Sequence, residues 1–413
     1  MSDIYDVAII GAGASGLFAA ITAARLGASV VLLDKNSIVG RKLLSTGNGR
    51  CNFLNEYQSL ECYRTQAPSE AKRVLDHLPK EEVLSFFDSI GIAAKSRNGY
   101  YYPYTNQAKD VRDCLDMELR RLEITTLLSS DVRNLSKKDN YFEISANQDL
   151  LKAKKCILAT GGKAFPKSGS DGWGYKAAQS FGHSIIEPFP ALTQIYSNDK
   201  SPFKWEGTRI DAAVSIIIDD TVAASDTGEI QLTKSGISGI PVFNVSRYAA
   251  MALKKNYKAK AVLNFLPHLT DKEACRIMQF RFFENGWGKS ALEAMRGLLD
   301  IKLSDMILDE LGIQKSCDAV SLGTKAIKSI VEKCRGFELD ITGTGDFDKA
   351  QTTAGGVPLA EINPDTMESR FCSGLYICGE LLDVDGICGG YNLNWAWVSG
   401  YTCGAVCKME AMS

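Results

Sequence analysis

The residues with the clearest chemical meaning form a glycine-rich stretch near the N-terminus. In GAGASG, residues 11–16, the glycines follow the spacing G-x-G-x-x-G, after an apolar run and before a helical pattern. The first glycine of this spacing permits a tight turn, the second lets a pyrophosphate approach the backbone, and the third lets the helix pack on the strand. The free N–H groups at a helix N-terminus also attract phosphates. The stretch therefore predicts a dinucleotide site that includes Gly11, Gly13, Ala14, Ser15 and Gly16.

An acidic residue follows at the distance that a ribose contact requires. YDVAII (5–10) is typical of a strand, LFAAITAARLG (17–27) of a helix, and SVVLL (29–33) of a second buried strand. Asp34 comes directly after this strand, about 20 residues beyond the glycines, as in dinucleotide-binding proteins. We expect Asp34 to accept hydrogen bonds from the ribose hydroxyls, with Lys35 beside it in the site.

The next segment, GRKLLSTGNGRCN (40–52), favours FAD over a nicotinamide dinucleotide. A nicotinamide enzyme usually continues with regular strand–helix repeats, whereas a long loop rich in Gly, Arg and Lys suits a ligand that lies extended, as FAD does. Arg50 either stabilises the anionic reduced flavin or contacts the pyrophosphate. Cys51 is interpreted as a packing residue, with a redox thiol or flavin anchor as the alternative. The expected FAD contacts here are Arg41, Lys42, Ser45, Thr46, Gly47, Asn48, Gly49, Arg50 and Asn52.

Three later segments end strands or begin helices in ways that suit the same cofactor. ILATGG (157–162) and GLYICGE (374–380) are buried strand patterns that run into glycines, and a carboxylate at such a strand end can bind ribityl hydroxyls. GGYNLNWAWVSG (389–400) is typical of a helix start, whose N–H groups can face the flavin N1–C2=O edge. The expected contacts are Val132, Thr160, Gly161, Gly162, Gly379, Glu380, Gly390, Tyr391, Asn392 and Leu393.

The elements that position these loops follow from the periodicity of the sequence. Further helices are expected at 68–90, 107–122 and 172–182, and short strands at 124–135, 141–145 and 155–159. The pattern changes to short strands and turns over 192–268, becomes helical over 270–335, and returns to a glycine-rich α/β pattern from about 346. The middle of the chain is therefore predicted to be an insertion, and the two ends to build one domain together.

Composition excludes several classes of function. A net charge of −2 over 413 residues offers no basic field for nucleic acid or an anionic membrane. No apolar run approaches the roughly 18 residues of a membrane span, and no basic segment precedes the first apolar run, so we expect a cytoplasmic protein. The twelve cysteines show no CxxC, and the three histidines lie far apart, so no metal site is predicted. The oligomeric state does not follow from the sequence.

These motifs together resemble a family of FAD-dependent oxidoreductases described as aminoacetone oxidase-like, which includes a bile-acid-reducing flavoprotein of gut bacteria. The resemblance spans nearly the whole chain through GAGASG, GRKLLSTGNGRCN, YPYTNQA, ATGGKAFPKSGSDGWGY, PFPALTQI, GEIQLTKSGISG, TTAGGV and GGYNLNWAW. The chain is also similar, more distantly, to the fumarate reductase flavoproteins. It implies an α/β fold in which a Rossmann-type FAD-binding domain (1–191 and 346–413) is interrupted by a β-barrel-like substrate domain (192–268 and 336–345) and a helical subdomain (269–335).

One departure from the family bears on catalysis. Lys234 stands where members commonly have a histidine, and Gly239, Ile240 and Pro241 replace a following Gly-Pro. Lys234 is either an acid–base group or a solvated lysine in a turn. The candidate catalytic residues are Tyr391 and Lys234 as proton donors, with water as the alternative, and Arg50 beside the flavin.

Three functions fit this reading. The first is a reductase in which NADH or NADPH reduces FAD, and hydride then passes from flavin N5 to an activated C=C of an enone-like substrate, such as an oxo-steroid or bile acid. The second is an oxidase of a small amino-ketone such as aminoacetone that uses O₂, and the third is a non-catalytic electron carrier. GTGDF (343–347) lacks a third glycine, so the nicotinamide cofactor would bind transiently in the substrate cleft. The expected partner is a small molecule.

Overall fold

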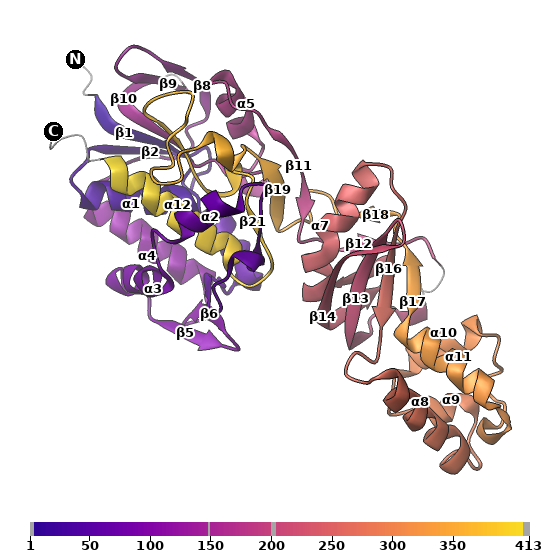
Figure 1. Ribbon diagram of the computed structural model, residues 1–413. Helices are drawn as coiled ribbons and strands as arrows, with labels where there is room; N and C mark the ends of the chain where they lie inside the picture. Colours follow the sequence, from indigo (N-terminus) through magenta and orange to yellow (C-terminus); the bar gives the residue numbers. More distant parts are fainter. Residues whose placement is uncertain (1–3, 148, 200–203, 408–413) are drawn as a thin grey trace. The chain divides into compact units, whose positions relative to one another are not determined.

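The chain forms two compact units in a computed structural model (Figure 1), which describes residues 4–147, 149–199 and 204–407. Unit 1 comprises Met1–Phe189 and Gln351–Ser413, and unit 2 comprises Pro190–Ala350. The two ends of the chain thus share one unit and the middle forms the other. The division falls close to the predicted domain boundaries at 191 and 346.

Unit 1 is built around a seven-stranded sheet in which β10 is the branching strand. It pairs in parallel with both β1 and β20 and antiparallel with β9. Ile9 of β1 lies opposite Leu32 on one side and Ile157 on the other. The strands are, in spatial order, β7 (Thr125–Leu127), β2 (Val30–Leu33), β1 (Tyr5–Ile10), β10 (Asp149–Leu158), β9 (Phe142–Ala146) and β8 (Val132–Lys137), with β20 (Leu375–Ile377) also on β10.

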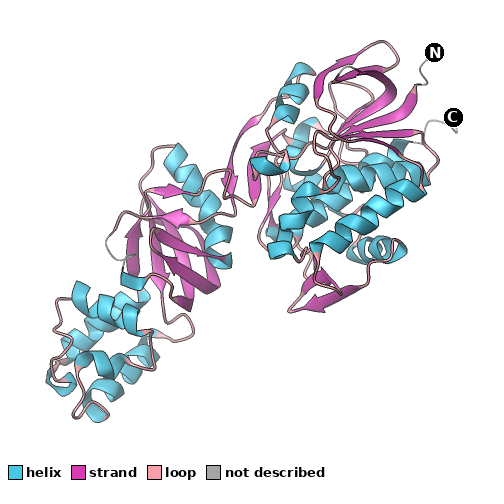
Figure 2. Cartoon of the chain, turned by 180° about the vertical axis from the view of Figure 1, so that it is seen from behind, coloured by secondary structure: helices cyan, strands magenta, loops and turns pink. Residues whose placement is uncertain are grey.

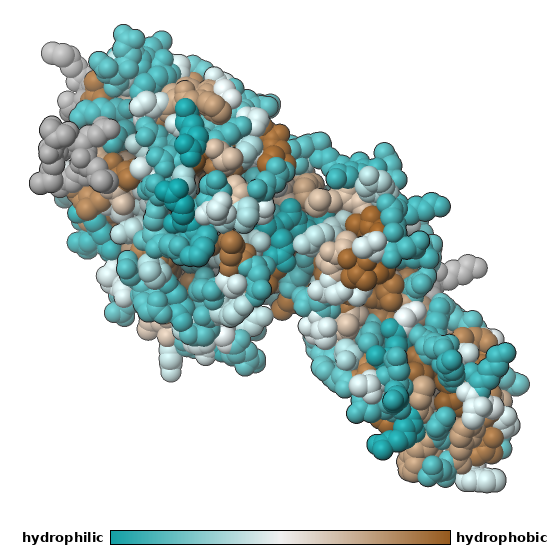
Figure 3. Space-filling model, viewed as in Figure 1, coloured by the Kyte–Doolittle hydropathy of each residue, from teal (hydrophilic) through white to brown (hydrophobic). Residues whose placement is uncertain are grey.

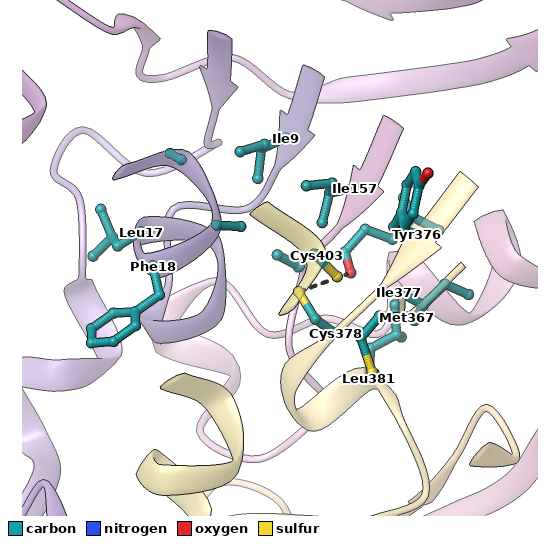
Figure 4. Close-up of a cluster of buried hydrophobic side chains, with 14 of the residues drawn as sticks. Ile9, Leu17, Phe18, Ile157, Met367, Tyr376, Ile377, Cys378, Leu381 and Cys403 are labelled. Carbon is teal, nitrogen blue, oxygen red and sulfur yellow. Dashed lines mark hydrogen bonds between the residues drawn. The ribbon is translucent and has the colours of Figure 1, made fainter. Parts of the chain in front are cut away.

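The parallel part of this sheet is buried on both faces. All four residues of β2 and the last four of β1 are buried, as expected for apolar runs in a parallel sheet. Figure 4 shows Ile9, Ile157 and Ile377, from three neighbouring strands, in one cluster with Leu17 and Phe18 of α1.

Helix α1 (Ala14–Arg25) lies against α12 (Tyr391–Ala405), the helix near the other end of the chain. Small residues permit this contact: a Cβ at Gly400 would overlap the carbonyl oxygen of Ser15, and one at Gly404 that of Ala19. The remaining helices of unit 1 are α2 (Pro68–Leu75), α3 (Lys80–Ser89), α4 (Ala108–Arg121) and α5 (Trp173–Ser180).

Three small sheets complete unit 1. They are β3 (Leu54–Asn55) with β6 (Tyr100–Pro103) and β5 (Ala94–Arg97), β4 (Tyr63–Arg64) with β21 (Asp385–Gly386), and β11 (Ile186–Ala191) with β19 (Thr352–Gly356). Unit 1 also contains the short 3₁₀ segments η1 (Arg41–Gly49) and η7 (Gly379–Leu381).

Unit 2 combines an antiparallel sheet with a group of helices that share its hydrophobic core. Figure 2 shows most helices of this unit gathered beyond one end of the sheet, whereas the helix Ile240–Lys254 packs on the sheet itself. The sheet contains β17 (Phe337–Asp340), β16 (Ala259–Asn264), β13 (Arg209–Ile218), β14 (Thr221–Thr233), β15 (Gly236–Gly239), β12 (Ile195–Tyr196) and β18 (Gly343–Thr344). The helices are α7 (Ile240–Lys254), α8 (Asp271–Gln279), α9 (Ala291–Met295), α10 (Ile301–Glu310) and α11 (Thr324–Arg335).

Local sequence signals explain where several of these helices begin. Thr270 and Glu273 form a reciprocal capping box at α8, and Ser290 and Glu293 form the same motif at α9. Each box satisfies backbone N–H groups that a helix start leaves without partners.

The structure corrects parts of the predicted element pattern. The predicted helix 68–90 is two helices, α2 and α3, because Pro79 cannot continue a helix. The region 192–268, predicted as short strands and turns, contains the long strands β13 and β14 and the helix α7. Pro241 stands in the first turn of α7, where a proline without an N–H is tolerated, and it does not mark a turn.

On the face drawn in Figure 3, hydrophilic residues predominate and hydrophobic residues form scattered patches. Across the described residues, no helix combines the length and the apolar content that crossing a bilayer requires. The same part of the chain brings no three His, Cys, Asp or Glu side chains together in a group suited to a metal ion.

Candidate functional site

The turn between β1 and α1 has the features of a pyrophosphate site. Gly11 has φ +107°, and a Cβ at Gly16 would overlap the carbonyl oxygen of Gly11, so both glycines are needed for the turn and the close packing of α1. Gly13 is different, because no heavy atom of the described chain beyond its own neighbours and the backbone of α1 lies within 4 Å of where its Cβ would be. Gly13 caps α1 without a side-chain hydrogen bond, and the first turn carries no acidic residue. The N–H groups of Ala14 and Ser15 therefore begin a helix that suits an anion.

Asp34 is fixed beside this turn, as the sequence predicts. Its Oδ2 accepts a hydrogen bond from Ala12 N at 2.7 Å, and its Oδ1 accepts from the backbone and side-chain nitrogens of Asn36 at 2.7 and 2.8 Å. A carboxylate offers about four acceptor positions, so a ribose hydroxyl can still bind. The Lys35 amine instead pairs with Asp171 at 2.6 Å.

Segment η1 folds as a 3₁₀ helix with an internal reversal, where the sequence suggested a loop. Gly47 and Asn48 have φ +55° and +54°, which turns the backbone between Thr46 and Arg50. The hydroxyls of Ser45 and Thr46 donate to the carbonyl oxygens of Lys42 and Leu43, at 2.8 and 2.6 Å. These two side chains thus stabilise the segment itself and leave its backbone to meet a ligand.

The end of the loop is pinned to the β3–β6 sheet. The Asn52 amide, oriented to satisfy both of its groups, donates to the carbonyl oxygens of Leu54 and Tyr101 at 3.0 and 3.1 Å. Cys51 is fully buried, and burial raises the pKa of its thiol to about 12. Because only the thiolate is a nucleophile, this environment fits the packing role predicted for Cys51.

The arginines of this region stay closer to the surface. Arg41 donates to Asn36 Oδ1 at 3.1 Å, next to Asp34, and Gly49 precedes the exposed Arg50. Arg41 thus stands where the ribose and pyrophosphate contacts are predicted.

Glu380 is the centre of a network that joins segments far apart in the sequence. Its Oε2 lies 2.7 Å from Lys42 Nζ, and its Oε1 accepts a hydrogen bond from Thr353 N at 2.9 Å. The Thr353 hydroxyl accepts from the backbone N–H groups of Lys163 and Ala164, at 2.8 and 2.9 Å. Four segments far apart in the sequence therefore meet here, namely η1, the stretch after β10, β19 and η7.

The strand ends beside Glu380 are glycines because larger residues would not fit. A Cβ at Gly162 would overlap the Thr353 side chain, and one at Gly379, with φ +70°, would overlap the Ser15 hydroxyl. Gly161 has φ +71°, which turns the chain away from β10. The ends of β10 and β20 thus lie against the start of α1.

Two hydroxyls near these strand ends are buried without a hydrogen-bond partner in the described chain, Thr160 Oγ1 and Tyr175 Oη. Tyr175, from α5, was not singled out from the sequence. Burial raises the pKa of its phenol, and the charges of Glu380 and Asp383 act in the same direction. The signal for this residue was its place in SGSDGWGY, directly after the glycine-rich end of β10.

The start of α12 is held close to β3. Gly390 has φ +93°, and a Cβ there would lie 2.8 Å from the backbone of Leu54. The Asn392 amide makes two hydrogen bonds with the backbone of Gly386, at 2.8 and 2.9 Å, and so aligns the first turn of the helix. Leu393 follows, half-buried.

Tyr391 lies in this turn and is 4% exposed. It packs edge-on against Tyr63, with ring centroids 5.7 Å apart. Burial is the largest effect on the pKa of its phenol, and a hydrogen bond with Cys62 adds to it, so the pKa lies well above the ordinary value. Tyr391 is therefore held protonated, and its role as a proton donor stays a prediction.

The last two predicted site residues lie on β8 of unit 1 and in a turn of unit 2. Val132 is buried at the start of β8, where it pairs with Ala146. Lys234 is exposed in the turn between β14 and β15 of unit 2.

The geometry of unit 1 fits FAD. The open space at Gly13 and the start of α1, which has no side-chain cap, suit a pyrophosphate, and Asp34 suits a ribose. The buried hydroxyl of Thr160 has no hydrogen-bond partner in the described chain, and a polar ligand would supply one. The residues that would hold the cofactor therefore come from α1, the end of β2, η1, the end of β10 and the start of α12.

A family profile described as the HI0933-like protein Rossmann domain matches residues 5–406. The chain belongs to the HI0933-like family. A relative from Clostridium scindens, named 3-dehydro-bile acid delta(4,6)-reductase, is 41% identical over 401 residues, which cover 96% of this chain and 98% of the relative. The prediction of an FAD-dependent oxidoreductase with a Rossmann-type α/β fold is confirmed.

Two further proteins are similar to this chain at lower sequence identity. The ribosomal RNA dihydrouridine synthase of Haemophilus influenzae is 29% identical over 413 residues, 98% of each chain. The structure of a 3-ketosteroid-delta4-(5alpha)-dehydrogenase from Rhodococcus jostii RHA1 aligns with a TM-score of 0.50 at 14% identity, over 98% of this chain and 97% of that one. The second likeness shows a shared fold.

Proposed function

We propose that this FAD-dependent oxidoreductase is a reductase of conjugated C=C bonds in small hydrophobic carbonyl compounds, with 3-oxo bile acids or steroids as the substrate class. The observation that carries the proposal is the full-length match at 41% identity to a protein named as a bile-acid reductase. The protein's net charge of −2 also favours a small-molecule substrate over a polyanion such as RNA.

In this proposal, FAD supplies the hydride when it is bound. The hydride adds to the β-carbon of the enone and a proton adds to the α-carbon, so the C=C bond is reduced and the carbonyl is kept. The chain's own part is to orient the cofactor: α1 and Asp34 bind its nucleotide end, and Glu380, Thr353 and the first turn of α12 fix the segments around its other end. Tyr391 or Lys234 is the proposed proton donor.

NADH or NADPH is the proposed source of the electrons. In the described chain, GAGASG at 11–16 is the one glycine turn of the G-x-G-x-x-G type between a strand and a helix, and it serves FAD in this proposal. The nicotinamide dinucleotide therefore binds transiently and leaves before the enone enters.

Anaerobic stopped-flow spectroscopy tests the proposal. NADH or NADPH is expected to bleach the flavin band at about 450 nm. A 3-oxo-Δ4 bile acid is expected to restore the band and to yield a product two hydrogens heavier. The saturated 3-oxo analogue, which lacks the C=C bond, is the matched control and should not restore the band.

Two results would overturn the proposal. Bleaching by aminoacetone followed by fast recovery in O₂ would make the protein an oxidase. Reduction of uridine in ribosomal RNA, with no turnover of enones, would assign the activity named for the Haemophilus influenzae relative.

A further inference from the structure

The ion pair between Lys42 and Glu380 connects η1 with η7, which lie at opposite ends of the sequence. The Lys42 Nζ and Glu380 Oε2 atoms are 2.7 Å apart, and the two side chains are 25% and 20% exposed. Charges that are mostly shielded from water interact more strongly than exposed charges and are screened less by salt. We therefore expect this pair to have a stronger electrostatic effect on neighbouring groups than the exposed ion pairs elsewhere on the surface.

The second oxygen of Glu380 extends the connection to β19 and to the segment after β10. Thr353 N donates to Glu380 Oε1, and the Thr353 hydroxyl accepts from Lys163 N and Ala164 N. The position of one carboxylate thus sets the relative position of four segments, three of which (η1, the stretch after β10 and η7) carry residues expected beside FAD.

The charge of this carboxylate matters because the cofactor is itself an anion. FAD carries two phosphate charges, and reduction can add a further negative charge to its ring. A carboxylate without a partner at this position would oppose both the binding of FAD and the addition of electrons, whereas a paired carboxylate keeps its acceptor oxygens at little electrostatic cost.

We propose that Lys42 is a positioning residue for Glu380: its ammonium group holds the carboxylate in place and neutralises it, so that the carboxylate can organise the FAD site without repelling the cofactor. The inference concerns the cofactor alone and holds whichever substrate the enzyme reduces. Its test therefore uses no enone, and its failure is distinguishable from failure of the proposed reductase function.

The test is a double-mutant cycle on FAD affinity. The dissociation constant of FAD is measured by fluorescence titration of the apoproteins of wild type, Lys42→Met, Glu380→Gln and the double variant. Lys42→Met is expected to weaken FAD binding about tenfold, or ~1.4 kcal/mol. The double variant is expected to bind FAD better than the product of the two single losses predicts, because the neutral amide no longer needs the ammonium group.

A second readout separates positioning from a purely structural role. The midpoint potential of the bound flavin is expected to become more negative in Lys42→Met and to return toward the wild-type value in the double variant and in Lys42→Arg. Lys72→Met is the matched control, because Lys72 pairs with Asp76 at 2.6 Å on the exposed surface of α2, and it should leave both quantities unchanged.

Three results would overturn the proposal. In the first, the loss of FAD affinity in the double variant equals the product of the two single losses. In the second, the midpoint potential of the bound flavin in Lys42→Met equals the wild-type value. In the third, Lys42→Met binds FAD as tightly as the Lys72→Met control does. Circular dichroism of each apoprotein verifies folding, and Lys42→Gln gives the same comparison if Lys42→Met does not fold.

Discussion

Alanine at Gly13 and at Gly16 should separate the needs of the fold from those of the cofactor. A Cβ at Gly16 would lie 1.8 Å from the carbonyl oxygen of Gly11. Carbon–oxygen contacts need about 3.3 Å, so α1 would have to move away from β1 by roughly 1.5 Å. Crowding of this kind costs about 1–3 kcal/mol or more, and Gly16→Ala should lower the free energy of unfolding of the apoprotein by at least that amount.

Gly13→Ala should behave in the opposite way. Gly13 has φ −80°, which alanine adopts freely, and its Cβ position is open. Replacing a glycine at a helix N-cap by alanine destabilises the protein by up to about 1 kcal/mol. Alanine also lowers the conformational entropy of the unfolded chain, which stabilises the folded protein by about 0.4–1 kcal/mol. The free energy of unfolding of the apoprotein should therefore stay within about 1 kcal/mol of the wild-type value. The added methyl group fills the space for the pyrophosphate, and FAD affinity should fall by at least about tenfold.

Both variants can be followed with the same two measurements, urea unfolding of the apoprotein and fluorescence titration with FAD. Wild-type FAD affinity in Gly13→Ala would refute the placement of the pyrophosphate over this glycine. A wild-type urea midpoint in Gly16→Ala would refute the argument that the third glycine is required by the packing of α1.

Three further predictions concern buried groups. Burial lowers the pKa of His183, against the opposing effect of Glu361. The unfolded state therefore binds the proton more tightly, and the free energy of unfolding should fall as the pH drops below about 6.5. Urea titrations at several pH values should show this loss in wild type and in the exposed control His268→Gln but not in His183→Gln. Tyr175→Phe removes a hydroxyl without a partner in the described chain and should raise the urea midpoint of the apoprotein, by up to about 1 kcal/mol in stability. Cys51, with a pKa of about 12, should resist iodoacetamide in the native protein and react once urea unfolds it, as mass spectrometry can show. A flat pH profile for wild type, a lower midpoint for the phenylalanine variant, or native labelling of the thiol would contradict the respective argument.

The nucleotide end of the site could be predicted from the sequence because its parts are local. The glycines and Asp34 belong to one strand–turn–helix–strand unit, and their spacing alone brings the carboxylate beside the turn. Glu380 and Gly162 could be placed near this turn because parallel strands bring their C-terminal ends to one edge of a sheet.

The contacts between distant segments could not be predicted in the same way. Lys42 and Glu380 are 338 residues apart in the sequence, so no local signal shows that these side chains form a pair. The buried state of Tyr391 depends on Tyr63 and Cys62, which β4 brings to the start of α12. Helix α7 was missed because the whole range 192–268 was assigned to short strands and turns from its strand-like stretches; the helix packs on β14.

The packing of α1 against α12 has a consequence for the order of events during synthesis. The residues of α1 from Ser15 to Ala23 are all buried, and Gly400 and Gly404 of the last helix cover part of them. On the ribosome, the first helix therefore emerges long before its partner has been translated. The apolar surface of α1 stays uncovered by α12 while almost the entire chain is translated, including all of unit 2, which can fold in the meantime. Contacts that span so much of a sequence form slowly and leave intermediates with exposed apolar surface, so α1 of the nascent chain is expected to bind chaperones until α12 has been translated.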